Sequence, residues 1–232
     1  MKKRLFPFTL LFTGLLTACI FDSEDEEEWD AAKVCPETGT NSYGMPNRGS
    51  FTDERDGQVY RYTTIGKQVW MAQNLNYDIE GSSCLFQEDN CVERGRHYPF
   101  ALVMGGGLCP KGWHVPSLDE WDKLVKSVDG PGVGAIHLKS TSGWDPLNPG
   151  ERSNGNDECG FSALPVSREK AVHQGYDAFF MTSTDRCDLG SDCENYSRYF
   201  YAKRMESKSD SITQNYYLVQ YGENQAIRCV KD

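Results

Sequence analysis

A cysteine, a histidine and an acidic pair lie close together in the segment CPKGWHVPSLDEW (109–121). Cys109 and His114 are the residue types that form a thiolate nucleophile and its base, and with Asp119 and Glu120 they are also types that bind zinc. A zinc site needs further cysteine or histidine ligands at short spacing, and no second pair of that kind occurs. The other three histidines are isolated in the sequence: His97, His137 and His173. The segment alone therefore leaves three roles open, namely a thiol site, a metal site and a structural joint.

The number of cysteines favours a structural role for Cys109. The chain has nine cysteines, and if Cys19 carries a lipid, as argued below, eight remain, which is the even number expected of disulfides in an oxidising compartment. A bridged Cys109 has no free thiolate, so we expect neither a catalytic residue nor a metal ligand in this segment. Spacing predicts two short loops and one long-range bridge, and elimination supplies the fourth pair: Cys84–Cys91, Cys187–Cys193, Cys109–Cys229 and Cys35–Cys159.

The first residues are typical of a bacterial lipoprotein signal peptide. A basic start, MKKR, precedes an apolar stretch from Leu5 to Leu16 that is too short to span a bilayer comfortably. The next residues complete the sequence LTAC, which resembles the lipobox, where the bond before the cysteine is cut and the cysteine is lipidated. We therefore expect residues 1–18 to be removed and Cys19 to carry palmitate. The remaining 214 residues (232 − 18) would have a formal net charge of −13 (−10 − 3).

An acidic run, IFDSEDEEEWD, follows the expected lipid anchor. Such a run cannot bury itself, so we predict a solvated tether over residues 19–34. The run also resembles the acidic stretch that routes some lipoproteins to the outer face of the cell, with a plain spacer as the alternative. We expect an outer-membrane lipoprotein of the cell envelope that is exposed at the surface and meets the membrane through its lipid. The acidic charge leaves no basic stripe for nucleic acid.

After the tether, the composition indicates a loop-rich lead-in and then one domain. Residues 35–57 are rich in Gly, Pro, Asn, Ser and Asp, whereas residues 58–232 carry the strand-like and helical patterns. Residues 59–71 are typical of a β-hairpin, because β-branched and aromatic residues flank a turn at Gly66-Lys67. Three further strand-like runs close the chain: about 196–204, 214–221 and 226–230.

A capping-box pattern at Ser117 and Glu120 predicts a helix that begins after Ser117. The apolar residues that follow repeat at helical spacing until Asp129-Gly130-Pro131. A weaker helix is expected within 97–104, and a long polar loop over 139–160. The order of these elements predicts an α+β fold with a small antiparallel sheet, one or two helices and long disulfide-clipped loops.

Five short motifs occur in order through the domain: VWMAQNLNY (69–77), CPKGWHVPSLDEW (109–121), LKSTSGW (138–144), CGFSALP (159–165) and RCVKD (228–232). Together they resemble the Fibrobacter succinogenes major paralogous domain over about residues 56–232. The resemblance implies a C-type-lectin-like fold, which is also the fold group of the formylglycine-generating enzymes. It implies a domain of exported proteins and lipoproteins whose molecular function is not established, and it carries over no catalytic residues.

Aromatic residues in the second half of the chain are candidates for a surface on which a sugar ring stacks. Alternation along strands would point roughly half of them into the core. Members of the family often have paired tryptophans where this chain has Phe179-Phe180-Met181, which weakens the case for a sugar platform at that position. The candidate ligand residues are Trp144, Tyr176, Phe179, Tyr199 and Tyr217.

The polar loop before Cys159 carries oxygen-bearing side chains of the kind that calcium uses. The same residue types build turns, and the Glu-Pro-Asn, Gln-Pro-Asp and Trp-Asn-Asp triplets of sugar-binding C-type lectins do not occur in the chain. We therefore expect no cofactor, and calcium is the ion that this loop would suit. The residues concerned are Asn148, Asn154, Asn156, Asp157 and Glu158.

These observations predict a non-catalytic binding module on a lipid anchor at the cell envelope. Carbohydrate, such as plant polysaccharide, is the expected ligand, largely by analogy with the fold group. An alternative is a protein-interaction or structural envelope module with no glycan ligand. A third hypothesis, a cysteine- or metal-dependent enzyme, requires a free thiol or a bound metal.

Overall fold

A computed structural model describes residues 28–84, 89–165, 175–185, 199–218 and 224–232. The strands are β1 (Arg48–Thr52), β2 (Val59–Ile65), β3 (Gln68–Met71), β4 (His97–Tyr98), β5 (Trp113–His114), β6 (Asp177–Asp185), β7 (Tyr199–Glu206), β8 (Ile212–Leu218), β9 (Gln225–Ala226) and β10 (Val230–Lys231). The helices are α1 (Ala31–Val34), α2 (Asp89–Arg94), α3 (Phe100–Met104), α4 (Leu118–Ser127) and α5 (Ala135–Leu138).

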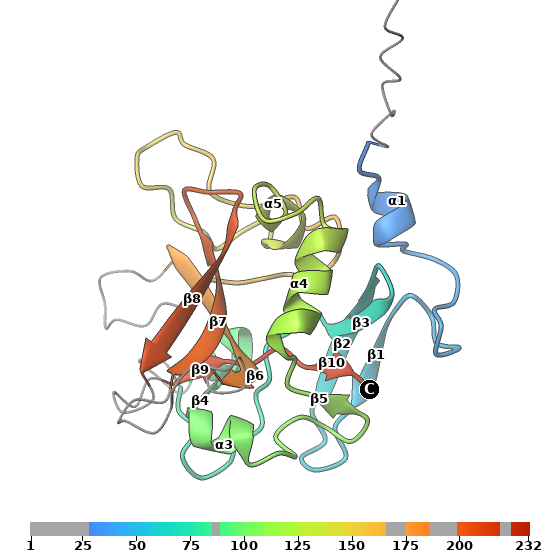
Figure 1. Ribbon diagram of the computed structural model, residues 1–232, viewed down its shortest axis with the longest axis vertical. Coiled ribbons are helices and arrows are strands. Elements are labelled where there is room, and N and C mark those ends of the chain that lie inside the picture. Colours follow the sequence, from blue (N-terminus) through green and yellow to red (C-terminus); the bar gives the residue numbers. More distant parts are fainter. Residues whose placement is uncertain (1–27, 85–88, 166–174, 186–198, 219–223) are drawn as a thin grey trace, which may run out of the picture.

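The architecture is mixed α+β and contains two five-stranded sheets (Figure 1). The first sheet has the order β1-β2-β3-β10-β5 and is antiparallel throughout. The second has the order β4-β9-β6-β7-β8 and is antiparallel except between β6 and β9. The sequence predicted one small sheet, so the number of sheets is a correction, whereas the α+β class is confirmed.

Helix α4 lies between the two sheets and packs against both (Figure 1). Its start is the predicted capping box, in which the Ser117 side chain accepts from the backbone of Glu120 and the Glu120 side chain accepts from the backbone of Ser117. The ring centroid of the buried Trp121 lies 4.8 Å from that of Trp70 in β3 and 5.3 Å from that of Phe180 in β6. One helical side chain therefore joins the cores of the two sheets.

Two of the longer strands, β1 and β6, were not predicted from the sequence, and neither were the two-residue strands β4 and β5. β1 lies in the expected lead-in and forms because its residues pair with β2, with Arg48 opposite Thr63 and Phe51 opposite Tyr60. β6 lies beyond the expected loop over 139–160, in a stretch for which no element was predicted, and it is buried for most of its length. Pairing decides both elements, β1 with the next strand and β6 with β7 and the distant β9, so their local composition gave little signal.

The predicted strand over 226–230 is in fact two short strands in different sheets. β9 belongs to the second sheet and β10 to the first, and the chain crosses from one sheet to the other between them. Arg228 lies in this crossing and is 1% exposed. The crossing therefore carries a fully buried charge.

The Arg228 guanidinium is satisfied by groups from two distant segments. Its Nε and Nη2 atoms donate to Asn74 Oδ1 at 3.0 and 2.6 Å, and Nη1 donates to Met71 O at 3.3 Å and to Phe161 O. The guanidinium also lies 4.4 Å from the centroid of the Phe161 ring. Burial lowers the pKa of Arg228 to about 9, so the group remains charged at neutral pH.

The beginning of the described chain is fastened to the domain. Asp30 caps α1 by accepting from Ala32 N at 2.9 Å, and Trp29 Nε1 donates to Ser127 O at 2.9 Å. The Trp29 ring stacks on His137 with centroids 3.6 Å apart. The last part of the predicted tether is therefore helical and packed against the domain, and not solvated as its acidic composition suggested. The contacts of Trp29 hold it there.

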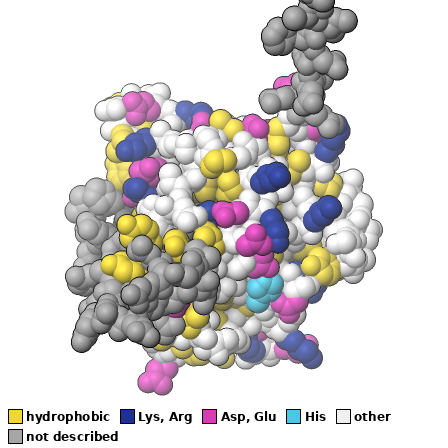
Figure 2. Space-filling view, in the orientation of Figure 1, with side chains coloured by type: hydrophobic (Ala, Val, Ile, Leu, Met, Phe, Trp, Pro, Cys, Tyr) yellow, Lys and Arg dark blue, Asp and Glu magenta, His cyan; other side chains and the backbone are white. Residues whose placement is uncertain are grey.

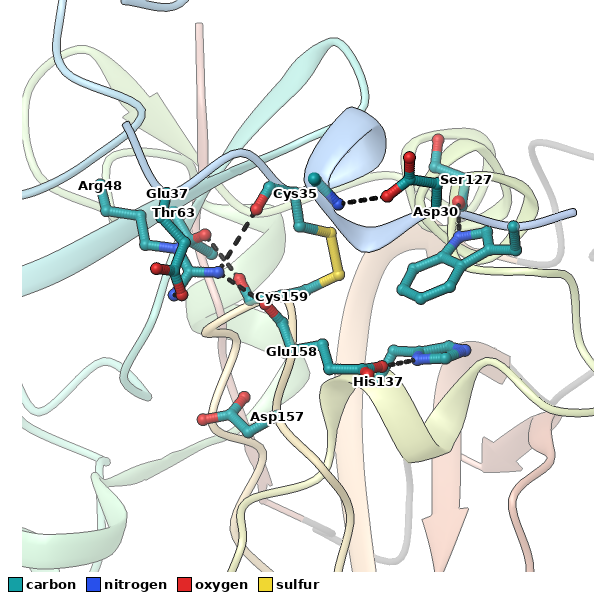
Figure 3. Close-up of a disulfide and its surroundings, with 12 residues drawn as sticks. Asp30, Cys35, Glu37, Arg48, Thr63, Ser127, His137, Asp157, Glu158 and Cys159 are labelled. Atoms are coloured by element: carbon teal, nitrogen blue, oxygen red, sulfur yellow. Dashed lines mark hydrogen bonds and ion pairs between the residues drawn. A yellow bond between two sulfur atoms is a disulfide. The ribbon is translucent and has the colours of Figure 1, made fainter. Parts of the chain in front are cut away.

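Three disulfides join partners that the cysteine spacing and elimination predicted: Cys35–Cys159, Cys84–Cys91 and Cys109–Cys229. Figure 3 shows the first of these, where the segment after α1 meets the loop that precedes Phe161. The predicted Cys187–Cys193 pair lies outside the described residues. Because Cys109 is bridged, it has no free thiol to act as a nucleophile.

The contacts of Arg228 predict a large loss of stability when the guanidinium is removed. Arg228→Met should lower the free energy of unfolding by about 2–5 kcal/mol, because buried acceptors at Asn74 and Phe161 lose their donors. Urea unfolding measures the change. Arg61→Met, at an exposed position on β2, is the control and should change stability by less than about 0.5 kcal/mol. Equal stability of the Arg228 variant and the wild type would contradict the role given to this residue.

Candidate functional site

Strands β5 and β10 give opposite faces of the first sheet different chemistry. Lys231 is opposite Trp113 in the register, and Val230 is opposite His114. Side chains alternate along a strand, so Trp113 and Lys231 share one face while His114 and Val230 share the other. The segment that raised the question of catalysis therefore supplies residues to two separate places.

The first sheet is strongly curved, and its two edges meet. β1 and β5 are at opposite ends of the strand order, yet the rings of Phe51 and Trp113 stack with centroids 4.5 Å apart and planes at 15°. Tyr62 of β2 lies beneath them, and its ring centroid is 6.3 Å from that of Trp113. A Cβ on Gly49 would be 2.5 Å from Tyr62 Oη, so glycine in β1 makes room for this ring.

Between the curved edges lies a cavity of about 530 Å³. Its floor is aromatic and consists of Tyr62 and Trp113, whose side chains are only 6% and 8% exposed. Phe51 is half-buried and forms part of the wall. Hydroxyl and charged groups also line the cavity. The lining residues are Met45, Ser50, Phe51, Thr52, Asp53, Glu54, Arg55, Tyr62, Pro110, Lys111, Trp113 and Lys231.

Two of the charged lining residues neutralise each other. Arg55 Nη2 lies 2.7 Å from Asp53 Oδ2, and Arg55 Nη1 also donates to Leu108 O at 2.9 Å. Burial alone would raise the pKa of Asp53, but the hydrogen bonds and charge of Arg55 outweigh it and hold that pKa below its usual value. This pair fixes the loop after β1.

Two lysines at the cavity have no such partner. No described residue forms an ion pair with Lys111 or Lys231. Lys231 Nζ lies 5.5 Å from the ring centroids of both Tyr43 and Trp113, and 3.4 Å from Gly112 O. The cavity therefore combines aromatic rings with two unpaired ammonium groups.

His114, on the other face, bridges two carboxylates. Its Nδ1 is 2.6 Å from Asp232 Oδ1 and its Nε2 is 2.7 Å from Glu120 Oε1. Partial burial would lower the pKa of His114, but the hydrogen bonds to Asp232 and Glu120 outweigh burial and raise it. The carboxylates lie on opposite ring nitrogens, so the three groups do not converge on one point where a metal could bind. The cluster joins α4 to the end of β10.

Two of the five predicted ligand residues are in the core, which corrects that prediction. Trp144 is 3% exposed, and its Nε1 donates to Ser140 Oγ at 3.1 Å and to Ala163 O at 3.0 Å. Phe179 is 6% exposed because it faces inward from β6. Neither ring is available to a sugar.

Of the other three predicted ligand residues, Tyr176 and Tyr199 do not line the cavity either. Tyr176 and Tyr199 are half-buried, and the Tyr199 ring centroid is 5.6 Å from that of Tyr216 on β8. Tyr217 belongs to β8, and its side chain lies outside the described part of the structure. Sequence type alone could not tell which aromatic residues would reach a common surface.

The loop proposed for calcium uses its oxygens internally. Asn154 Oδ1 accepts from Trp144 N at 3.0 Å, Asp157 accepts from Ser162 N and Oγ at 2.7 and 2.6 Å, and Glu158 pairs with His137. In the other part of the loop, the Asn148 side chain donates to Glu151 Oε1 at 2.7 Å, and Asn156 is exposed. Within the described residues, no group of three or more His, Cys, Asp or Glu could hold a metal ion.

A buried lysine, Lys139, supplies a positive charge beside the loop proposed for calcium. Lys139 is 1% exposed, and its Nζ donates to Ser153 O at 2.9 Å, Ser209 O at 3.0 Å and Glu206 O at 3.2 Å. Burial lowers the pKa of Lys139 to about 8. A buried ammonium thus gathers backbone carbonyls that hold the loop against the second sheet.

Comparison with known proteins gives one result. The family model of the Fibrobacter succinogenes major domain matches residues 63–231. The chain belongs to this family. No curated protein and no solved structure matches the chain. Three of the motifs that resemble the family meet at Arg228, which contacts Met71, Asn74 and Phe161.

The cavity is built partly from the family domain and partly from the chain before it. Lys111, Trp113 and Lys231 lie inside the match to the Fibrobacter succinogenes major domain, whereas Phe51 and Arg55 precede it. Neither Phe51 nor Trp113 was among the ligand residues predicted from the sequence. The only local signal for the cavity was the position of Trp113 and Lys231 within two of the family motifs.

The bridged histidine predicts a defined pH dependence of stability. The pKa of His114 is raised in the folded protein above the usual histidine value of 6.5. The stability that His114 contributes is therefore fully present below pH 6.5 and is lost as pH rises through the pKa of the folded protein. Burial alone would raise the pKa of Glu120, but the hydrogen bonds with Ser117 and His114 outweigh burial and lower it. The stability that Glu120 contributes is therefore lost as pH falls below the usual value of 4.5. His114→Gln should therefore reduce the melting temperature more at about pH 5.5 than at about pH 8.5.

Differential scanning calorimetry of wild type and His114→Gln at both pH values measures this difference. All other titrating groups are shared by the two proteins, so the wild type serves as the control. A variant that loses the same stability at both pH values would show that the charge of His114 is not what stabilises the joint.

Proposed function

We propose that this chain is a non-catalytic carbohydrate-binding module and that the cavity between β1 and β5 is its binding site. The observation that carries the proposal is the Phe51–Trp113 stack at the wall of a cavity with a polar rim. Sugars bind proteins by packing the apolar face of a ring on an aromatic side chain while polar groups fix the hydroxyls. The volume of about 530 Å³ is within the range of small-ligand sites.

Binding rather than catalysis is supported by the state of the reactive residue types. Cys109 is bridged to Cys229, and His114 is held between two carboxylates that it does not share with a nucleophile. Ser117 Oγ donates to Glu120 Oε2 at 2.8 Å, so this hydroxyl is directed to an acid and not to the imidazole. These residues have structural partners that account for them.

The finer fold assignment is also part of the proposal. We place the domain in the C-type-lectin-like group, on the family resemblance and on the α+β arrangement with a long loop between its sheets. The last strand, β10, lies between β3 and β5, so the end of the domain returns to strands from its first half.

We further place the protein in the outer membrane, lipid-anchored and exposed at the cell surface. The support is the sequence before the described residues: the lipobox-like LTAC at 16–19 and the acidic run after it. Among the described residues, no helix is long and apolar enough to cross a membrane. The lipid on Cys19 would then provide the attachment.

Replacement of the lipidated residue tests the anchor. Cys19→Ser should move the protein from the detergent phase to the aqueous phase in phase partitioning and abolish palmitate incorporation. Protease shaving of intact cells should remove the wild-type protein. A wild-type protein that survives shaving would place the domain on an inner face, and one that takes up no palmitate would exclude the anchor.

Removal of the exposed wall of the cavity tests carbohydrate binding. Phe51→Ala should weaken retention on insoluble plant polysaccharides about tenfold or more, because the sugar ring would lose the aromatic side chain on which it packs. Tyr216→Ala, which removes a ring that is 59% exposed on β8, is the matched control and should bind as the wild type does.

Circular dichroism of both variants checks that the domain is folded. Wild-type protein that binds neither the insoluble polysaccharides nor a glycan array would contradict the proposed function. Crosslinking on intact envelopes would then test the protein-interaction alternative, which requires a partner in stoichiometric amount.

A further inference from the structure

We infer that the cavity selects sugars that carry a carboxylate, such as uronic acids. This inference rests on the proposed function and names the ligand class for the same site. Its starting point is a contrast in charge, because the whole chain has a formal net charge of −10, while three of the five charged lining residues are cations.

The two acids of the lining offset two of the three cations, so the lining keeps a net charge of +1. Asp53 is 1% exposed and is fully engaged by Arg55. Asp232 directly follows Lys231, but its carboxylate is on the other face of the sheet with His114. Glu54 is the remaining carboxylate of the lining, and it forms no ion pair with a described residue. Lys111 and Lys231 therefore line the cavity together with one further carboxylate, and neither lysine forms an ion pair with a described residue.

The positions of the two lysines follow from the backbone. Lys231 is directly opposite Trp113 in the β5–β10 register. Lys111 is in the turn before β5, where Trp113 N donates to Pro110 O at 3.0 Å and Gly112 has a φ of 81°. That turn needs glycine, because φ is in the left-handed region. The Lys231 ammonium consequently lies 5.5 Å from the centroid of the Trp113 indole, and Lys111 lines the same cavity from the turn before β5.

A sugar ring with a carboxylate matches this arrangement. Its apolar face would pack on Phe51, which is half-buried and is supported from behind by Trp113. The carboxylate at the ring edge would then accept charge-assisted hydrogen bonds from the ammonium groups. A neutral sugar would use the ring but leave both lysines unpaired. The charge is therefore what should distinguish ligands at this site.

Polygalacturonate and its fully methyl-esterified form provide a matched pair of probes, since they share the sugar ring and differ in charge. The full-length lipidated protein, in detergent micelles, should bind polygalacturonate about tenfold or more tightly than the ester in isothermal titration calorimetry. Raising the salt concentration should reduce this preference, because exposed charges are screened.

The double variant Lys111→Gln/Lys231→Gln should lose about tenfold in affinity for polygalacturonate and no longer prefer it to the ester. The control is Lys67→Gln/Lys126→Gln, which removes the same charge from exposed positions in the β2–β3 turn and on α4. It should bind as the wild type does. Melting temperatures of both variants check that the fold is intact.

The possible failures can be told apart. Equal binding of polygalacturonate and the ester, unchanged in the Lys111/Lys231 variant, would overturn the charge selection and leave carbohydrate binding in place. No binding to either polymer or to neutral plant polysaccharides would overturn the proposed function itself. If the Phe51→Ala variant binds both polygalacturonate and dextran sulfate as the wild type does, that result would show that the protein attracts any polyanion, which also overturns the inference.

Discussion

The burial of one arginine is the constraint on which the rest of this structure depends. Arg228 lies where the chain passes from the second sheet to the first, and its donors bind the segment after β3 and the loop at Phe161. A guanidinium presents its donors in a fixed plane, so these acceptors determine its orientation. Three residues later the same chain places Lys231 opposite Trp113. The position of the cavity wall thus follows from a charge in the core.

Elements with a local signal could be predicted from the sequence. Elements whose composition is that of a loop, or whose partners are distant, could not. The capping box at Ser117 and the apolar period after it predicted α4, and the β-branched residues around Gly66 predicted the β2–β3 hairpin. β1 contains Gly49 and Ser50 and looks like a loop, yet it pairs with β2 along its whole length. The division of 226–230 between two sheets is likewise fixed by neighbours far away in sequence.

The candidate site illustrates the same limit. Aromatic residue type is not a guide to exposure, and Trp144 and Phe179 are in the core, although they belong to types that bind sugars. Phe51 and Trp113 meet because the first sheet curves until its edges touch, and no spacing in the sequence expresses that curvature. The glycine opposite Tyr62 is a small trace of it, since a larger residue would collide with the ring.

The Cys35–Cys159 bridge has a mechanical consequence (Figure 3). Figure 2 shows a face of the molecule on which acidic and basic side chains are interspersed. A pull on the chain that precedes Cys35 reaches this bridge before it reaches β1, which begins at Arg48. The sulfur–sulfur bond then transmits the load to Cys159 in the body of the domain. The strand that carries Phe51 is thereby shielded from such a pull, and the cavity can keep its shape under that load.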